Sequence, residues 1–476
     1  MLGRLVWLST QKREYKQKDH YGLFFIKSLR FLLYLSHFLC ISFKKIYTIY
    51  VEVNMKILFK DAIIITMNDK NDILKGDVFV DGNTIQKIGK VSGENFDRVI
   101  DCKGKALMPG FINTHCHLAM SLFRGIGENT NFNNWWHDNM RPLEEQCSDE
   151  DFYNGVKLGL LECIQNGITS VVDLYMANNM TAKAMKELGV RGWIGVGAIT
   201  GSEVLDEKYL DAEIDKIKKT NNDVKPILYA HSIYSCDESQ YAELVKYSKK
   251  HNLTITTHLS ETLKEVGECY TKYQMTPVEL LESYGVLDRN TLLAHCVHCD
   301  KDDVQIMKNY NVNVTSCPSS NLIIGSGIAP IYSYTKNNIN VCVSTDGAAS
   351  NNSLDMFKEM FLLDNLQSGV LNQPFALTTL ETLRSATING AKALGEDKLG
   401  KIEKGCFADI ILLDLTLPNA LPINNLINNV VNSMGTKNVC LTMVNGNILY
   451  ENNQFLIDNA DKIKQNAIKS IKNLKI

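Results

Sequence analysis

Residues 107–117 read Leu-Met-Pro-Gly-Phe-Ile-Asn-Thr-His-Cys-His, an apolar run that predicts a strand ending in a His-x-His pattern. Side chains at positions i and i+2 of a strand share a face. His115 and His117 therefore point the same way and can hold one ion together. Taken alone the pattern is a weak signal, because two surface histidines would fit it as well. The other strands of the chain decide between these readings.

Similar strands recur along residues 108–400, where short apolar runs alternate with helical patterns. The predicted strands end near His117, Tyr175, Ile199, His231, His258, His295, Ser316 and Asp346. A strand and a helix about every 30 residues is typical of βα units, and eight units predict an α/β protein with a (β/α)8 TIM-type barrel. The long gap after the first strand would be a loop inserted over the barrel mouth. A doubly wound open sheet is the alternative, but no glycine-rich dinucleotide fingerprint follows any strand.

Short strands are also predicted on both sides of the barrel, in residues 55–107 and 401–450. Asp81-Gly82 and Asn445-Gly446 each stand between apolar runs, as the turn of a β-hairpin does. Because chain ends often lie close together, we expect both segments to form one small β-sandwich domain. Residues 451–476 are expected to be a C-terminal helical tail.

The first 54 residues differ from the rest in charge. They carry a net charge of +6, whereas the whole chain has −3, so residues 55–476 carry −9. Their apolar stretch is interrupted by Lys27, Arg30 and His37, which suits neither a spanning helix nor a signal peptide. The strand pattern begins at Met55. We expect residues 1–54 to be an upstream-translated or non-native leader outside the fold, with a membrane anchor or a disordered or partner-binding tail as alternatives.

Composition excludes several classes of protein. A body at −9 is a poor candidate for binding nucleic acid, which usually needs a basic face. The 13 cysteines are scattered and odd in number, so reduced thiols in the cytoplasm fit better than a disulfide framework. We therefore expect a cytoplasmic protein that acts on a small molecule, without a nucleic-acid or membrane partner. The oligomeric state is left open, and a homo-oligomer is compatible with the sequence.

Residue types that bind metals stand at the ends of several predicted strands. Five of the ten histidines are among them, and the carboxyl ends of parallel strands meet at the mouth of a barrel. Three imidazoles and a carboxylate, with water in an open position, suit a catalytic divalent ion. We expect zinc, with iron or manganese as alternatives, and the predicted ligands are His115, His117, His258 and Asp346. His231 stands where a lysine could form a bridging carbamate, which favours one ion over two.

The remaining polar groups suggest catalytic roles. Such an ion would lower the pKa of its bound water and supply hydroxide at neutral pH. Glu261, three residues past His258, is placed to protonate a substrate atom as general acid, although a solvated loop carboxylate is the alternative. His295 could orient or deprotonate the water, or be a fifth ligand. Asp346 could move a proton as well as bind the ion.

Four motifs resemble the amidohydrolase superfamily, and most of all its 5-methylthioadenosine/S-adenosylhomocysteine deaminases. They lie in residues 109–117, 257–262, 294–298 and 344–352, and the resemblance runs from about Met55 to about Tyr450. It implies hydrolytic deamination of an adenine ring. Hydroxide would attack carbon 6, Glu261 would protonate a ring nitrogen, and ammonia would leave with help from His295 and Asp346.

The same resemblance implies how the substrate is bound. Glu144, with Trp135 in the loop before it, matches a glutamate that binds ribose hydroxyls, and His231 matches a histidine that contacts the substrate. For Trp135, a loop anchor is the alternative. Glu261 and Asp346 would also contact the base. The implied substrates are 5'-methylthioadenosine, S-adenosylhomocysteine, adenosine and 5'-deoxyadenosine, each converted to its inosine derivative and ammonia.

One departure and two alternatives accompany this resemblance. Val196 stands where the family often has an arginine near the 5' substituent, which makes a carboxylate-bearing tail a poorer fit. Another amidohydrolase, such as a guanine or pterin deaminase or a triazine chlorohydrolase, is the alternative activity. A non-catalytic or membrane-tethered protein is the alternative class.

Overall fold

The computed structural model describes residues 55–127, 135–176, 178–201, 204–220, 223–472 and 474, without the side chains of Trp135 and His137. The predicted leader, residues 1–54, lies outside the described residues. Among the helices in the described ranges, none is both long and apolar enough to cross a membrane.

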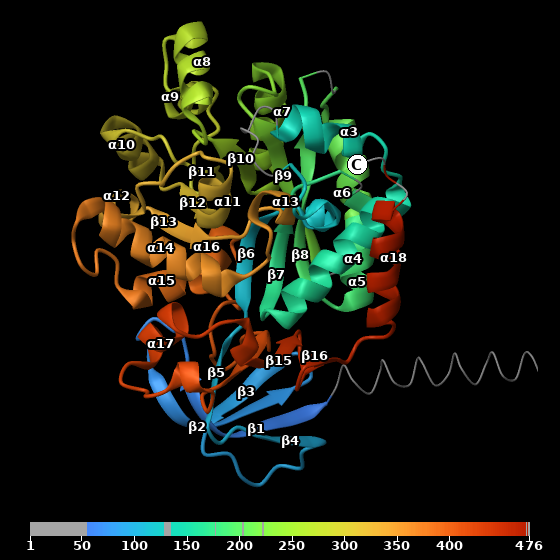
Figure 1. Cartoon of the computed structure of the whole chain (residues 1–476), viewed down its shortest axis with the longest axis vertical. Helices are drawn as coiled ribbons and strands as arrows, with labels where there is room; N and C mark the ends of the chain where they lie inside the picture. The colour runs from blue at the N-terminus through green and yellow to red at the C-terminus, as the bar shows by residue number, and fades with distance from the viewer. Residues whose placement is uncertain are drawn as a thin grey trace, which may run out of the picture. The chain divides into compact units, whose positions relative to one another are not determined.

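Eight parallel strands form the barrel at the centre of Figure 1 and are hydrogen-bonded in sequence order. They are β6 (Phe111–Cys116), β7 (Ile168–Asp173), β8 (Arg191–Ala198), β9 (Val224–Ser232), β10 (Ile255–Leu259), β11 (Thr291–His295), β12 (Asn313–Ser316) and β13 (Asn340–Val343). Just beyond β13, the backbone N–H of Asp346 donates to the carbonyl of His115 in β6 at 3.1 Å, which brings the first and last strands together. The predicted (β/α)8 barrel is confirmed, and its strands end within a few residues of the expected positions.

Several of the helices that follow these strands begin at residues whose side chains cap them. The segments between strands contain η1 (Leu118–Phe123), η2 (Trp135–Met140), α3 (Arg141–Glu144), α4 (Asp149–Gln165), α5 (Asn178–Leu188), α6 (Glu207–Thr220), α7 (Glu238–His251), α8 (Leu263–Tyr273), α9 (Pro277–Ser283), α10 (Lys301–Tyr310), α11 (Pro318–Ile323), α12 (Ile331–Lys336), α13 (Ala348–Asn351), α14 (Met356–Leu371), α15 (Thr379–Ser385) and α16 (Ile388–Ala393). Ser148, Asp237 and Thr276, for example, each accept a backbone N–H of the helix that they start. Apolar residues of the strands and the inner helix faces share one buried core.

The two ends of the described chain build a second, mixed sheet, below the barrel in Figure 1. It comprises β1 (Lys56–Ile65), β2 (Ile73–Asp81), β3 (Thr84–Gly89), β4 (Arg98–Asp101), β5 (Lys105–Pro109), β14 (Ile410–Asp414), β15 (Val439–Val444), β16 (Asn447–Glu451) and β17 (Gln454–Phe455). Antiparallel pairing of β14 with β5 joins the two ends. Both predicted hairpin turns are present, because β2 pairs with β3 and β15 with β16. The exact limits of the predicted domains stay a prediction.

Two contacts fix these parts on the barrel. Arg191, at the start of β8, is 5% exposed and bonds Asp409 of the sheet through Nε at 2.9 Å. The sheet therefore lies at the amino ends of the barrel strands and leaves their carboxyl ends open. Three short elements, η3 (Pro418–Ala420), α17 (Leu426–Asn432) and η4 (Thr436–Asn438), lie between β14 and β15. After the sheet, α18 (Ala460–Lys472) packs along α4. Asn154 of α4 donates to Ser470 of α18 at 3.1 Å.

Candidate active site

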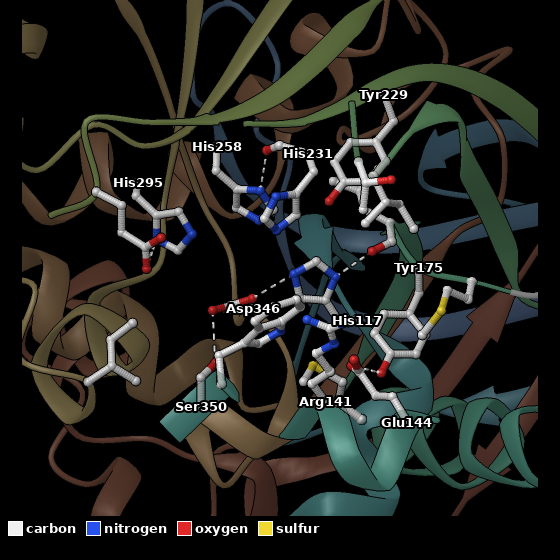
Figure 2. A pocket seen from close by; sticks show the side chains of 18 of the residues that line it. His117, Arg141, Glu144, Tyr175, Tyr229, His231, His258, His295, Asp346 and Ser350 are labelled. Atoms are coloured by element: carbon white, nitrogen blue, oxygen red, sulfur yellow. Dashed lines mark hydrogen bonds and ion pairs between the residues drawn. The ribbon is translucent and has the colours of Figure 1, made fainter. Parts of the chain in front are cut away.

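A pocket of about 300 Å³ lies at the carboxyl ends of the barrel strands. Figure 2 shows its side chains converging from separate strand ends, with His117, His231 and His258 around its centre. Residues of the segment inserted after β6, among them Arg141 and Glu144, complete one wall. The long gap that the sequence places after the first strand therefore contributes to the mouth, as expected.

Backbone carbonyls fix the orientation of two of the histidines. His117 Nδ1 lies 2.5 Å from the carbonyl oxygen of Leu174, and His258 Nδ1 lies 2.6 Å from that of His231. Because a carbonyl can only accept, Nδ1 carries the proton in both rings, and the lone pair of Nε2 is left free. This is the arrangement found around metal-binding histidines.

His115 and Asp346 supply buried polar atoms without hydrogen-bond partners. Within the described part of the chain, neither ring nitrogen of His115 has one, nor does Asp346 Oδ1, although both residues are buried. Asp346 Oδ1 lies 3.5 Å from His115 Nε2 and 3.2 Å from His117 Nε2. Its other oxygen accepts the hydroxyls of Ser320 at 2.6 Å and Ser350 at 2.8 Å. The serines thus hold the carboxylate so that its unpaired oxygen faces the imidazoles.

The histidines and Asp346 are arranged as ligands of a cation. Ligand atoms of His115, His117 and His258 lie within 4.8 Å of one another. Burial lowers the pKa of His115 to about 4 and that of His258 well below its usual value, so both rings are neutral, as ion binding requires. The structure brings together all four predicted ligands, whose role as ligands stays a prediction.

A second group of possible ligands shares one histidine with the first. His115, His295 and Cys317 also have ligand atoms within 4.8 Å of one another. Burial, however, raises the pKa of the Cys317 thiol well above its usual value. A thiol that keeps its proton is a poor ligand. The chemistry of the donors therefore favours a single ion at the first group.

Glu261 and His295 lie side by side next to these histidines. Glu261 is 5% exposed, and burial raises the pKa of its carboxyl group, which favours the protonated form that a general acid needs. His295 Nδ1 lies 3.8 Å from Glu261 Oε1 and 2.8 Å from Asn321 Oδ1. With the amide oxygen as acceptor, the other ring nitrogen of His295 is free to accept a proton.

The opposite wall carries the predicted sugar-binding carboxylate. The Tyr175 hydroxyl donates to Glu144 Oε1 (Figure 2), while burial raises the pKa of Glu144. His231 lines the same pocket, and its Nδ1 lies 2.7 Å from the Ser235 hydroxyl. The side chain of Trp135 lies outside the described residues, and its predicted role stays a prediction.

Val196 does not stand where the family comparison suggested. Its side chain is completely buried in the main core and does not line the pocket. Ile199 and Thr200, just beyond the end of β8, line it instead. The expectation that Val196 adjoins the 5' substituent is therefore wrong, because its place on the strand directs it into the core. It gives no ground for disfavouring a carboxylate-bearing tail.

Several contributing residues were not predicted from the sequence. Tyr175 was recognised only as a strand end, and Ser320 and Ser350 were given no role. Their positions gave one weak indication, since a polar residue just past the end of a barrel strand usually faces the barrel mouth. Which polar group such a residue meets depends on loop conformation, which residue types alone do not specify.

Comparisons with known proteins agree with this geometry. Residues 106–449 match the amidohydrolase family. The chain is 36% identical over 436 residues to 5-methylthioadenosine/S-adenosylhomocysteine deaminase of Thermoanaerobacter pseudethanolicus, covering 88% of this chain and 99% of the relative. It is 36% identical over 414 residues to 5'-deoxyadenosine deaminase of Methanosphaera stadtmanae, covering 85% and 96%. The fold is also that of a zinc-bound adenosine deaminase from Xanthomonas campestris, with a TM-score of 0.84 at 23% identity over 88% of this chain and 99% of that one.

Proposed function

The chain belongs to the amidohydrolase family, and from this we propose that it hydrolytically deaminates an adenine nucleoside to the inosine derivative and ammonia. Relatives at 36% identity are named for this activity on 5'-methylthioadenosine, S-adenosylhomocysteine and 5'-deoxyadenosine. The observation that carries the proposal is the pairing of two sites in one pocket. A cluster of imidazoles with Asp346 adjoins Glu261, whose pKa is raised by burial, and a carboxylate held by Tyr175 faces them.

The ion site would be formed by His115, His117, His258 and Asp346, and we propose zinc as its occupant. A divalent ion held there would act as a Lewis acid and lower the pKa of water near it. Three histidines and one carboxylate suit zinc chemistry. Ser320 and Ser350 act on this site indirectly by fixing the carboxylate of Asp346.

The protons of the reaction can be assigned to residues. Water adds at carbon 6 of the adenine ring, and Glu261 donates its proton to the neighbouring ring nitrogen. Asp346 and His295 accept a proton from the water and deliver it to the amino group, which leaves as ammonia. Loss of the remaining hydroxyl proton returns Glu261 to its acid form and leaves a 6-oxopurine, so water and amine are exchanged without any change of oxidation state.

We propose that Glu144 binds the ribose hydroxyls. Tyr175 donates to one of its oxygens and so fixes the plane of the carboxylate, whose remaining lone pairs can accept two hydroxyl donors. Glu144→Ala is expected to lower kcat/KM for adenosine by about 10- to 100-fold, since a hydrogen bond to a charged group contributes about 1.5–3 kcal/mol. Turnover of 2',3'-dideoxyadenosine, which lacks both hydroxyls, should be unchanged. Equal losses for both substrates would contradict this role.

An ammonia-release assay tests the activity itself. The panel should contain adenosine, 5'-methylthioadenosine, S-adenosylhomocysteine, 5'-deoxyadenosine and guanine, with metal content measured on the same sample. Release from one or more adenine nucleosides is expected. Turnover of guanine alone would instead assign the chain to a different activity within the family.

We also propose a cytoplasmic location. All twelve cysteines in the described part of the chain are free, and nine of them are buried. Reduced thiols are typical of a compartment without disulfide-forming machinery.

A further inference from the structure

Helix α8 begins with a sequence pattern that five other α-helices in the described chain share. These helices have an N-cap residue whose side chain accepts a backbone N–H, and a polar residue at the third helical position whose side chain bonds back to the N-cap N–H; they are α4, α7, α9, α10 and α15. In α9, for example, the N–H of Thr276 donates to Glu279 at 2.8 Å. Thr262 and Glu265 predict the same closed arrangement for α8.

Glu265 departs from that arrangement. Thr262 accepts the N–H of Glu265 at 3.1 Å, so half of the capping pattern is present. The carboxylate, however, reaches further back along the chain: Oε1 accepts the N–H of Ser260 at 2.9 Å, and Oε2 accepts that of Glu261 at 2.8 Å. With 3% of its surface exposed, the side chain is turned inward onto the end of the preceding strand.

The two backbone N–H groups that Glu265 accepts lie beyond the end of strand β10. Strand β10 ends at Leu259, so the next backbone N–H groups fall outside the sheet and need partners of their own. Ser260 has φ 50°, a left-handed conformation that residues other than glycine adopt uncommonly. Its carbonyl accepts the N–H groups of Val297 and His298 at 3.0 and 2.9 Å. The backbone is therefore held from both sides at an unfavourable conformation.

This backbone carries the side chain of Glu261 toward the reacting base. Glu261 emerges one residue after the left-handed turn and reaches to 3.8 Å from His295. Among the described residues, no hydrogen bond to the Glu261 carboxyl group fixes its direction, since His295 lies 3.8 Å away, so its aim depends on the peptide from which it starts. A carboxylate buried as deeply as that of Glu265 is costly, and burial raises its pKa to about 7.

We propose that Glu265 is a positioning residue, which clamps the Ser260 and Glu261 peptides so that the Glu261 carboxyl group is aimed at the substrate. This inference rests on the proposed function, in which Glu261 donates the proton. Glu265 touches neither substrate nor ion in this scheme. It acts through the backbone, and its effect should appear in kcat rather than in substrate binding.

The test compares Glu265→Gln and Glu265→Ala with Glu279→Gln in the full-length, metal-loaded protein. Glu279 is the matched control, because it is a glutamate at the same position of the neighbouring helix and bonds only its own N-cap. We expect Glu265→Ala to lower kcat by about 10- to 100-fold with KM unchanged, because small misplacements of a catalytic group have effects of this size. Glu265→Gln keeps one hydrogen-bond acceptor, so its kcat should lie between that of Glu265→Ala and that of the wild type.

A second background separates positioning from general loss of folding. Glu265→Ala added to Glu261→Gln should reduce kcat little further, because the group that it positions is already inactive. A similar loss in both backgrounds, or a kcat for Glu265→Ala equal to that of the control, would overturn the proposal.

Amide hydrogen exchange provides a readout that needs no substrate. Exchange at Ser260 and Glu261 should become faster in Glu265→Ala and stay slow in the control. Unchanged exchange would overturn the clamp. If wild type released ammonia from none of the nucleosides, the proposed function would fail, whereas exchange would still show whether Glu265 holds the strand end.

Discussion

Glu261→Gln is expected to lower kcat by about 100- to 10,000-fold, the usual contribution of a positioned general acid. Glutamine has nearly the same shape as glutamic acid but has no proton to give to a ring nitrogen. Burial raises the pKa of Glu261, which favours the protonated form that a general acid needs. Metal content should be unchanged, since Glu261 is not among the predicted ligands.

Steady-state kinetics with the best nucleoside, together with elemental analysis of the same preparation, measures this effect. Glu268→Gln is the matched control, because Glu268 lies on the outer face of α8, with 61% of its side chain exposed. The control should keep wild-type kcat. A Glu261→Gln protein as active as the control would show that another group protonates the base.

The barrel was predictable because its strands repeat at regular intervals and end in polar residues. The spacing of His115 and His117 places both on one face, whatever the rest of the fold. His258 and Asp346 could be added only by assuming that the strands are parallel and closed. The hydrogen bond from Asp346 to the His115 carbonyl shows why the assumption works: the last strand returns to the first.

The residues that orient the site were not predictable in the same way. Ser320 and Glu265 are each a few residues past a strand, where the chain turns, and their partners depend on that turn. Thr262 and Glu265 would even have predicted one wrong bond, since the common capping pattern pairs the Glu265 carboxylate with the N–H of Thr262, whereas it binds the N–H groups of Ser260 and Glu261. The expectation that Val196 adjoins the 5' substituent is wrong for a related reason, because the alternation of side chains along β8 places Val196 in the core. Residue type indicates chemistry, but the partner is set by tertiary structure.

Removal of the ion is expected to have the largest effect of all, abolishing measurable ammonia release. Without it, His115 and Asp346 would keep buried polar atoms that have no hydrogen-bond partner, and nothing else in the site could activate water. The apo protein should also unfold at a lower temperature, because an ion present at 1,000 times its Kd stabilises the folded state by about 4 kcal/mol. Zinc added back to the apo protein should restore both properties.

Dialysis against a chelator, followed by calorimetry and the ammonia assay, tests this expectation. A pair of histidine variants tests which residues bind the ion. His258→Asn should fail to retain the ion and should resemble the apo protein, since it removes one of three imidazoles whose ligand atoms lie within 4.8 Å of one another. His251→Asn, at the exposed end of α7, should behave as wild type. Full turnover by protein in which elemental analysis detects no metal would contradict the assignment of these residues as an ion site, because the reaction would then not need the ion that they are proposed to bind.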